Sequence, residues 1–307
     1  MAITAKDVQK LREMTGVGMM DCKKALVEAD GNFDKAIEWL REKGLAAQTK
    51  KAGKVAAEGV SLAMVADNGV GVLIEVNSQT DFVAKNEVFQ GFVKDVASVV
   101  ATDDPADVEA LKNCKYPGTD RTVADVTADK VLAIGENIQI RRFVRCAGGV
   151  SVPYVHMNGK VGVLVNLEVE GIDADKVVEL GKDVAMQICA MNPTYLDKSN
   201  VSQEVLDKEK EIQLAIMAND PKMAAKPDKV KEGIVTGKLR KFYEENCLLQ
   251  QAFVKDGSVS VEQYVANEAK AAGGSVTFKN AIRFEKGEGI EKRQENFAEE
   301  IAKQLQK

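Results

Sequence analysis

The chain has 307 residues, of which 45% are hydrophobic and 29% are charged, and its formal net charge is −5. A chain of this length can form two or three modules, each with a hydrophobic core of its own. The charge balance is slightly acidic, so the chain has no overall basic field, and we expect no nucleic acid among its partners.

No segment carries the signals of membrane insertion or secretion. Uncharged apolar runs are all shorter than the ~20 residues that span a bilayer. Residues 1–7 lack the apolar core of a signal peptide and the Arg-rich composition of a transit peptide. The five cysteines are far apart and never form a Cys-x-x-Cys pair, which argues against disulfides and zinc. We therefore expect a cytoplasmic protein without a metal ion and without a membrane partner.

Residues 1–45 are predicted to form three short helices. Thr4 and Asp7 have the spacing of a capping box at the start of the first helix. The glycines of Gly16-Val17-Gly18 interrupt the chain before the second helix, and Gly44 is expected to end the third. The size of this unit and its Met-Thr-Gly-Val-Gly loop resemble a ubiquitin-associated (UBA) domain.

The segment after these helices, Ala46–Glu58, is rich in Ala and Lys and contains Gly53. Such a composition is typical of a linker between modules. We therefore place a first module, consisting of the three helices and their linker, at residues 1–55.

The next part of the chain contains an internal duplication. Gly59-Val60-Ser61 lies nine residues before an Asn-Gly pair, and so does Gly149-Val150-Ser151. Asn-Gly favours a hairpin turn, because both central residues of such turns need positive φ. A similar apolar strand and then a helix follow each turn. The repeat predicts two α+β core subdomains with small antiparallel sheets of about three strands, at residues 56–148 and 149–286.

The second copy carries an insertion at about residues 201–246, which is polar and helical and has no strand signal. A Pro-containing turn divides it into two helices, each with a narrow apolar stripe. The stripes are formed by Val205, Ile212 and Ile216 and by Val230, Ile234, Leu239 and Phe242. Narrow stripes are typical of a coiled-coil hairpin, which could support self-association. The last module, residues 287–307, is expected to be an amphipathic helix.

The residues that carry enzyme chemistry are scarce. His156 is the single histidine, so a His-based triad or a multi-His metal site lacks the side chains it needs. Gly233–Leu239 is too short for a phosphate-binding loop and lies within the helical insertion rather than after a strand. We therefore expect no cofactor, no direct nucleotide binding and no covalent catalysis. Residues 102–122 are expected to form a surface loop or a short helix.

Thr80-Asp81-Phe82-Val83 follows an apolar strand, residues 71–77, and precedes a helix that starts near Glu87. Connections of this kind run over the surface, where a large apolar ring has no local core to enter. Phe82 would then enter a pocket of a partner, with the Asp81 carboxylate beside it. In the alternative interpretation, Phe82 packs under its own helix and Asp81 caps that helix.

Four long blocks of this sequence, in the same order, resemble the elongation factor Ts family of bacterial translation. Together they extend from the first module to the last, so that the resemblance covers essentially the whole chain. The blocks are Leu11–Leu26, Gln79–Asn86, Ile134–Arg142 and Ile282–Lys292.

The resemblance implies a guanine nucleotide exchange factor for elongation factor Tu in protein biosynthesis. It would bind the GDP form of its partner and promote GDP release by disturbing the partner's magnesium and phosphate site. It further implies that this magnesium dislocation depends on Thr80, Asp81, Phe82 and Val83. The secondary partner contacts that it implies are Leu11, Val17, Gly18, Met19, Met20 and His156.

Two other function classes fit parts of the sequence. A UBA-type interaction adaptor without exchange activity would account for residues 1–45 but leaves the duplicated core unexplained. A small-molecule enzyme would need a buried pocket around Asp81 or His156, and the spacing of the residues predicts none. A pull-down from lysate distinguishes the adaptor from the exchange factor, because it shows which protein is the main binding partner.

Overall fold

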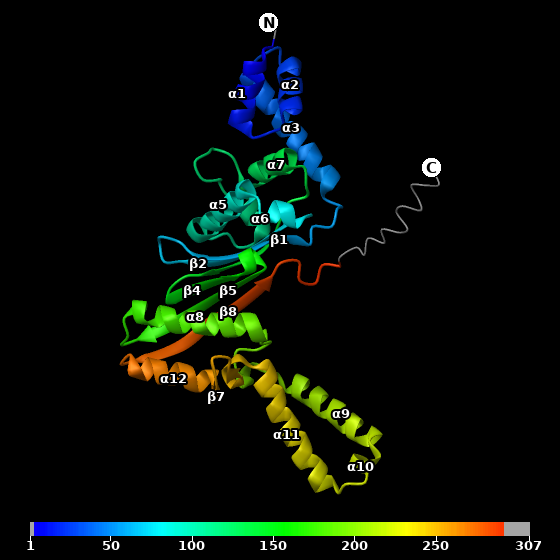
Figure 1. Cartoon of the computed structure of the whole chain (residues 1–307), viewed down its shortest axis with the longest axis vertical. Coiled ribbons are helices and arrows are strands. Elements are labelled where there is room, and N and C mark those ends of the chain that lie inside the picture. The colour runs from blue at the N-terminus through cyan, green and yellow to red at the C-terminus, as the bar shows by residue number, and fades with distance from the viewer. Residues whose placement is uncertain (1–2, 292–307) are drawn as a thin grey trace. The chain divides into compact units, whose positions relative to one another are not determined.

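The computed structural model describes residues 3–291 and combines helices with small antiparallel sheets (Figure 1), which confirms the predicted α+β class. The described chain divides into two compact units. Unit 1 comprises residues 3–145, 155–162 and 284–291, and unit 2 comprises residues 146–154 and 163–283. The predicted C-terminal helix, with Phe297, Ile301 and Leu305 on one face, lies outside the described residues.

Unit 1 begins with three helices, α1 (Ala5–Thr15), α2 (Met19–Glu28) and α3 (Phe33–Lys51). The predicted capping box is present, because Thr4 and Asp7 each accept a hydrogen bond from the other's backbone N–H. Gly16 ends α1 in the left-handed conformation, with φ of 69°. The three helices enclose a small core of Val8, Leu11, Val17, Cys22, Ala25, Leu26, Ala29, Ala36 and Leu40.

Helix α3 does not end at Gly44, contrary to the sequence prediction, but continues to Lys51. A Cβ at Gly44 would lie 3.2 Å from the carbonyl oxygen of Ala128 in α7 (Val123–Ile134). The glycine therefore allows two helix backbones to approach each other closely and is not a stop signal. Much of the predicted linker, Ala46–Glu58, consequently belongs to this helix.

The sheet of unit 1 has the order β1-β2-β3, with strands β1 (Glu58–Val65), β2 (Gly71–Ser78) and β3 (Gln139–Cys146). Strands β1 and β2 are antiparallel and pair from Glu58↔Ser78 to Val65↔Gly71. Every residue of the central strand β2 is buried. Helix α5 (Glu87–Asp103) packs on this sheet with Phe89, Phe92, Val93 and Val96 in the shared core.

Two short helices complete unit 1. Helix α4 (Asp81–Ala84) directly follows β2, and α6 (Val108–Asn113) lies in the segment for which a loop or short helix was predicted. Asn86 separates α4 from α5 and caps α5, because its side-chain oxygen accepts hydrogen bonds from the N–H groups of Val88 and Phe89.

Both Asn-Gly turns lie between paired strands, as predicted, but their conformations differ. In the turn between β1 and β2 only Gly69 has positive φ, 77°. In the turn that contains the short 3-10 helix η1 (Met157–Gly159), Met157, Asn158 and Gly159 all have positive φ. The requirement for positive φ at both central residues is thus wrong for the first turn, which is longer than two residues.

Most residues of the sheet β4-β5-β8 belong to unit 2. Its strands are β4 (Val150–His156), β5 (Val161–Glu170) and β8 (Ser275–Glu285). Helix α8 (Ala174–Met191) approaches β4 closely, because a Cβ at Gly181 would lie 2.5 Å from Val152 Cγ2. The remaining elements of unit 2 outside its helical hairpin are η2 (Lys198–Asn200), η3 (Leu248–Gln250), β6 (Ala252–Phe253), β7 (Asp256–Ser260) and α12 (Val261–Ala271).

The insertion of unit 2 forms a helical hairpin of α9 (Gln203–Asn219), α10 (Pro221–Ala224) and α11 (Asp228–Asn246), with α9 and α11 side by side (Figure 1). The face between the helices differs from the predicted stripes. Met217 and Val235 are buried, whereas Ile212, Ile216 and Val230 are exposed. Adjacent residues of a helix point in directions about 100° apart. The inner face of α9 therefore contains Met217, and the neighbouring Ile216, which was predicted to lie on that face, points to solvent.

Among the helices of residues 3–291, none is both long enough and apolar enough to cross a bilayer.

Candidate partner-binding site

The turn after β2 presents the predicted site residues. Thr80 is the N-cap of α4, and its hydroxyl oxygen accepts a hydrogen bond from the backbone N–H of Val83 at 3.4 Å. Ser78 Oγ donates to the carbonyl oxygen of Thr80 at 3.0 Å. These local hydrogen bonds give the turn a defined backbone conformation, which fixes the positions of the Asp81 and Phe82 Cα atoms.

Phe82 is 80% exposed, although the other phenylalanines of the same segment, Phe89 and Phe92, are fully buried. The surface position predicted from the sequence is confirmed, and the alternative in which Phe82 packs under its own helix is wrong. Burying a phenyl ring is worth about 1.5–3 kcal/mol, which this side chain does not gain within the chain. Aromatic side chains, Phe among them, are enriched in the buried centre of protein–protein interfaces.

Asp81 lies at the start of α4 and forms an ion pair with Lys85 at 2.6 Å. The hydrogen bond from Lys85 lowers the pKa of the Asp81 carboxyl against a smaller opposing effect of desolvation, and the charges of Lys85 and Lys286 lower it further. The carboxylate is therefore ionised at neutral pH and reachable from solvent. Thr80 provides the side-chain cap of α4 and Asn86 provides that of α5, so the alternative in which Asp81 caps the helix near Glu87 is wrong.

The backbone before the turn is held from behind by Glu136, which lies between α7 and β3. Its Oε2 accepts hydrogen bonds from the N–H groups of Gln79 and Thr80, each at 3.0 Å. Its Oε1 accepts a third from the hydroxyl of Thr80 at 2.7 Å. Asn137 completes this contact, because its N–H donates to Gln79 Oε1 at 2.9 Å.

A second carboxylate, Glu75, lies fully buried in the middle of β2. It accepts hydrogen bonds from Arg141 Nη1 at 2.9 Å and Arg142 Nε at 2.6 Å, both on β3. It also accepts from Asn77 Nδ2 at 3.0 Å and from the backbone N–H of Gly287 at 2.7 Å. Burial alone would raise the pKa of Glu75, but these hydrogen bonds together lower it below its usual value.

The segment that leads to the C-terminus is anchored at this carboxylate. Gly287 has φ of 70°, and a Cβ there would lie 2.1 Å from the carbonyl oxygen of Ala57. Lys286 forms an ion pair with Glu58 at 2.6 Å, and Arg142 reaches Glu288 at 3.1 Å. Backbone conformation, close approach and charge thus fix residues 286–288 on the sheet of unit 1.

The predicted secondary contacts lie in two kinds of environment. Leu11 and Val17 are buried in the core of the N-terminal helices and do not lie on the surface, so their assignment as direct contacts is corrected. Both side chains form part of the apolar core that the three helices share, whereas Met19 and Met20 lie outside that core. Gly18, Met19 and Met20 are exposed.

Two further exposed methionines adjoin predicted contacts. Met14 is exposed near the end of α1, and Met157 is exposed directly after His156. His156 is itself exposed at the end of β4. Sequence reasoning missed Met14, because its place on a helix gave no sign that it faces solvent.

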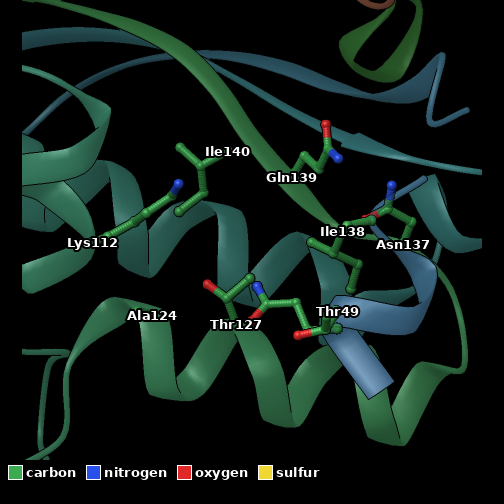
Figure 2. Close-up of a pocket in the computed structure, with 10 residues that line it drawn as sticks. Thr49, Lys112, Ala124, Thr127, Asn137, Ile138, Gln139 and Ile140 are labelled. Carbon is green, nitrogen blue, oxygen red and sulfur yellow. The ribbon is translucent and has the colours of Figure 1, made fainter. Parts of the chain in front are cut away.

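One pocket of unit 1 is formed without the two exposed side chains of this turn. It has a volume of about 590 Å³ and is lined from α3, α6, α7 and the start of β3, with Thr49, Thr127 and Gln139 among its polar residues (Figure 2). Asp81 and Phe82 do not line it. Within residues 3–291, no group of three His, Cys, Asp or Glu side chains is placed to hold a metal ion.

Replacing Glu75 with Gln is expected to lower the stability of unit 1 by about 2 kcal/mol at neutral pH. Stability is lost because Arg141 and Arg142 no longer have a charged acceptor. The loss is smaller than that for breaking a fully buried ion pair, because both arginine side chains are partly exposed to solvent. Urea unfolding followed by the fluorescence of Trp39, which packs against the N-terminal core, measures the change.

The pH dependence provides an independent check of the same carboxylate. A group with a lowered folded pKa contributes stability above its unfolded pKa, and the contribution is lost as the pH falls through the folded pKa. Wild-type stability should therefore decline below about pH 4.5, the ordinary value for this group, and Glu75→Gln should decline less steeply. Glu109→Gln, at an exposed position of α6, is the control. Equal acid sensitivity of Glu75→Gln and wild type would contradict the assignment.

Comparisons with known proteins give one consistent family. Residues 79–288 match the family model described as Elongation factor TS. Elongation factor Ts of Syntrophotalea carbinolica is 49% identical over 304 residues, which cover 98% of this chain and 99% of the relative. Elongation factor Ts of Clostridioides difficile is 49% identical over 305 residues, 99% of each chain. That of Clostridium kluyveri is 46% identical over 308 residues, again 99% of each. The resemblance found in the sequence is thereby confirmed, and the chain belongs to the elongation factor Ts family.

Proposed function

We propose that this protein is the guanine nucleotide exchange factor for elongation factor Tu in translation elongation. It binds the GDP form of that GTPase, promotes GDP release and leaves when GTP enters, without covalent chemistry of its own. Membership of the elongation factor Ts family supports this role. The observation that carries it is the exposed Phe82 on a capped turn, beside the ionised Asp81.

An exchange factor must bind the nucleotide-free state of its partner better than the GDP-bound state. A thousandfold acceleration requires about 4 kcal/mol of such differential binding. Complete burial of one phenylalanine provides about 1.5–3 kcal/mol. Phe82 therefore needs the support of other contacts, and the exposed Met19 and Met20 and the surface at His156 are the remaining candidates.

The turn acts on the partner's magnesium site. Phe82 enters between elements of the GTPase near the magnesium ion, and Asp81 reorganises the groups around that ion. Weaker magnesium binding removes the main counter-charge of the GDP phosphates, so GDP leaves faster. Thr80 and Val83 hold the shape of the turn, which agrees with the hydrogen bond between them.

The remaining modules increase the area of the interface. Gly18, Met19 and Met20 form an adaptable apolar contact, and Leu11 and Val17 act indirectly by holding the loop that carries it. The surface around His156 contacts a different domain of the partner. The helical hairpin at residues 201–246 exposes Ile212, Ile216 and Val230, which suit self-association.

We assign the modules as in the sequence prediction: a UBA-like unit with its linker at 1–55, core subdomains at 56–148 and 149–286, and a C-terminal module at 287–307. The adaptor alternative is not favoured by the family assignment.

Phe82→Ala should slow the release of fluorescent GDP from elongation factor Tu by a factor of roughly 5–30. This range corresponds to a loss of about 1–2 kcal/mol at the transition state. The side chain is exposed, so the free energy of unfolding should change by less than about 0.5 kcal/mol. Stopped-flow fluorescence with a fixed excess of each variant measures the rate.

Val254→Ala, at another exposed apolar position but in unit 2, is the matched control and should exchange at the wild-type rate. A well-folded Phe82→Ala protein that releases GDP as fast as wild type would rule out the wedge.

Truncation after Glu291 should weaken binding to elongation factor Tu, because the final segment acts as a strap on the GTPase. This endpoint keeps the bond between Gly287 and Glu75. On truncation, the rate of GDP release from the formed complex should change by a smaller factor than the dissociation constant for elongation factor Tu. Titration of labelled elongation factor Tu measures the affinity, and an unchanged dissociation constant would show that the segment is no strap.

A further inference from the structure

We infer that Glu136 is a positioning residue for nucleotide exchange. It does not itself contact the partner but fixes the backbone from which Asp81 and Phe82 project. The inference rests on the proposed exchange function and extends it to a residue 54 positions beyond Phe82 in the sequence.

The contact pattern of Glu136 is that of a clamp on one short stretch of backbone. One oxygen accepts from the consecutive N–H groups of Gln79 and Thr80, and the other accepts from the hydroxyl of Thr80. Two successive N–H groups that point at one anion form a rigid concave binding site. Hydrogen bonds to a charged acceptor are stronger than those between neutral groups.

The clamp also sets the orientation of the helix cap. A threonine hydroxyl has one proton, which Thr80 donates to Glu136. Its lone pairs are then available to accept the N–H of Val83, which closes the first turn of α4. Glu136 therefore controls the direction in which α4 leaves β2, and with it the direction of Phe82.

Glu136 is itself held on a rigid base. Gly135 ends α7 with φ of 83°, and Ile138, two residues after Glu136, is fully buried. The side chain of Asn137 donates to the carbonyl oxygen of Lys54 at 2.8 Å, and Lys51 donates to that of Gly135. The dipole of α7 disfavours a carboxylate just beyond its C-terminus. The three hydrogen bonds that Glu136 accepts from the turn offset this unfavourable interaction.

The exposure of Phe82 makes such a clamp necessary. At 80% exposure the ring has almost no packing neighbours to orient it, so its direction depends on the backbone alone. A turn that must be ordered on binding reduces the binding free energy available for the reaction. By holding the turn in advance, Glu136 leaves that free energy for the displacement of GDP.

The test compares Glu136→Ala, Glu136→Gln and Phe82→Ala in a double-mutant cycle, with GDP release from elongation factor Tu at saturating exchange factor as the readout. Glu136→Ala should reduce the saturating rate on the order of tenfold, because a misplaced group loses its effect in the reaction. In the Phe82→Ala background the same substitution should have a clearly smaller effect, since the clamp acts in part through that ring and only its effect on Asp81 remains.

Glu136→Gln should recover most of the rate, because the amide oxygen can still accept from both N–H groups and the amide nitrogen can donate to Thr80. Glu109→Ala, at an exposed carboxylate of α6 in the same unit, is the control. Wild-type protein that fails to accelerate release would overturn the proposed function. Wild-type activity with an unaffected or fully additive Glu136→Ala would overturn only the positioning role.

If Glu136→Ala does not fold, Thr80→Val and Thr80→Ser provide the same comparison from the other side of the clamp. Valine removes the hydroxyl that Glu136 binds, and serine keeps it. A slower rate for valine than for serine, with the difference reduced in the Phe82→Ala background, is the expected result. Equal rates for valine and serine would overturn the inference.

Discussion

The fold of unit 1 depends on one buried carboxylate, Glu75 at the centre of its sheet. An ionised group without solvent is stable only if donors surround it. Arg141 and Arg142 come from the neighbouring strand, and the N–H of Gly287 comes from a segment 212 residues further on. The requirement to satisfy this one charge therefore joins the beginning, the middle and the end of the chain into one scaffold.

That scaffold serves to present a side chain that it does not bury. Strand β2 is buried along its whole length, the turn after it is held by Glu136, and Phe82 then projects into solvent. The fixed backbone behind the turn therefore holds the exposed Phe82 ring in place. The Glu75 and Glu136 contacts connect three of the four sequence blocks that resemble the family, and the exposed methionines of the N-terminal helices lie in the fourth.

The sequence predicts the features that depend on local chemistry. The capping box at Thr4, the Asn-Gly turns and the position of Phe82 between a strand and a helix all follow from neighbouring residues. Features that depend on distant neighbours were missed or wrong. Gly44 was predicted to end a helix, because its close approach to Ala128 of another helix is not visible in the sequence. The partner contacts that the resemblance implies for Leu11 and Val17 are wrong because both residues belong to the core of their own module. Glu75 and Glu136 resemble any other acidic residue, because their donors lie on other strands and turns.

The central claim is that this scaffold catalyses nucleotide exchange on elongation factor Tu. The most direct measurement is the release of fluorescent GDP from purified elongation factor Tu at substoichiometric amounts of the wild-type protein. We expect fast release of all the bound nucleotide, with each molecule of the exchange factor acting many times. Unaccelerated release in the presence of a folded protein would contradict the account and would leave a binding module without exchange activity.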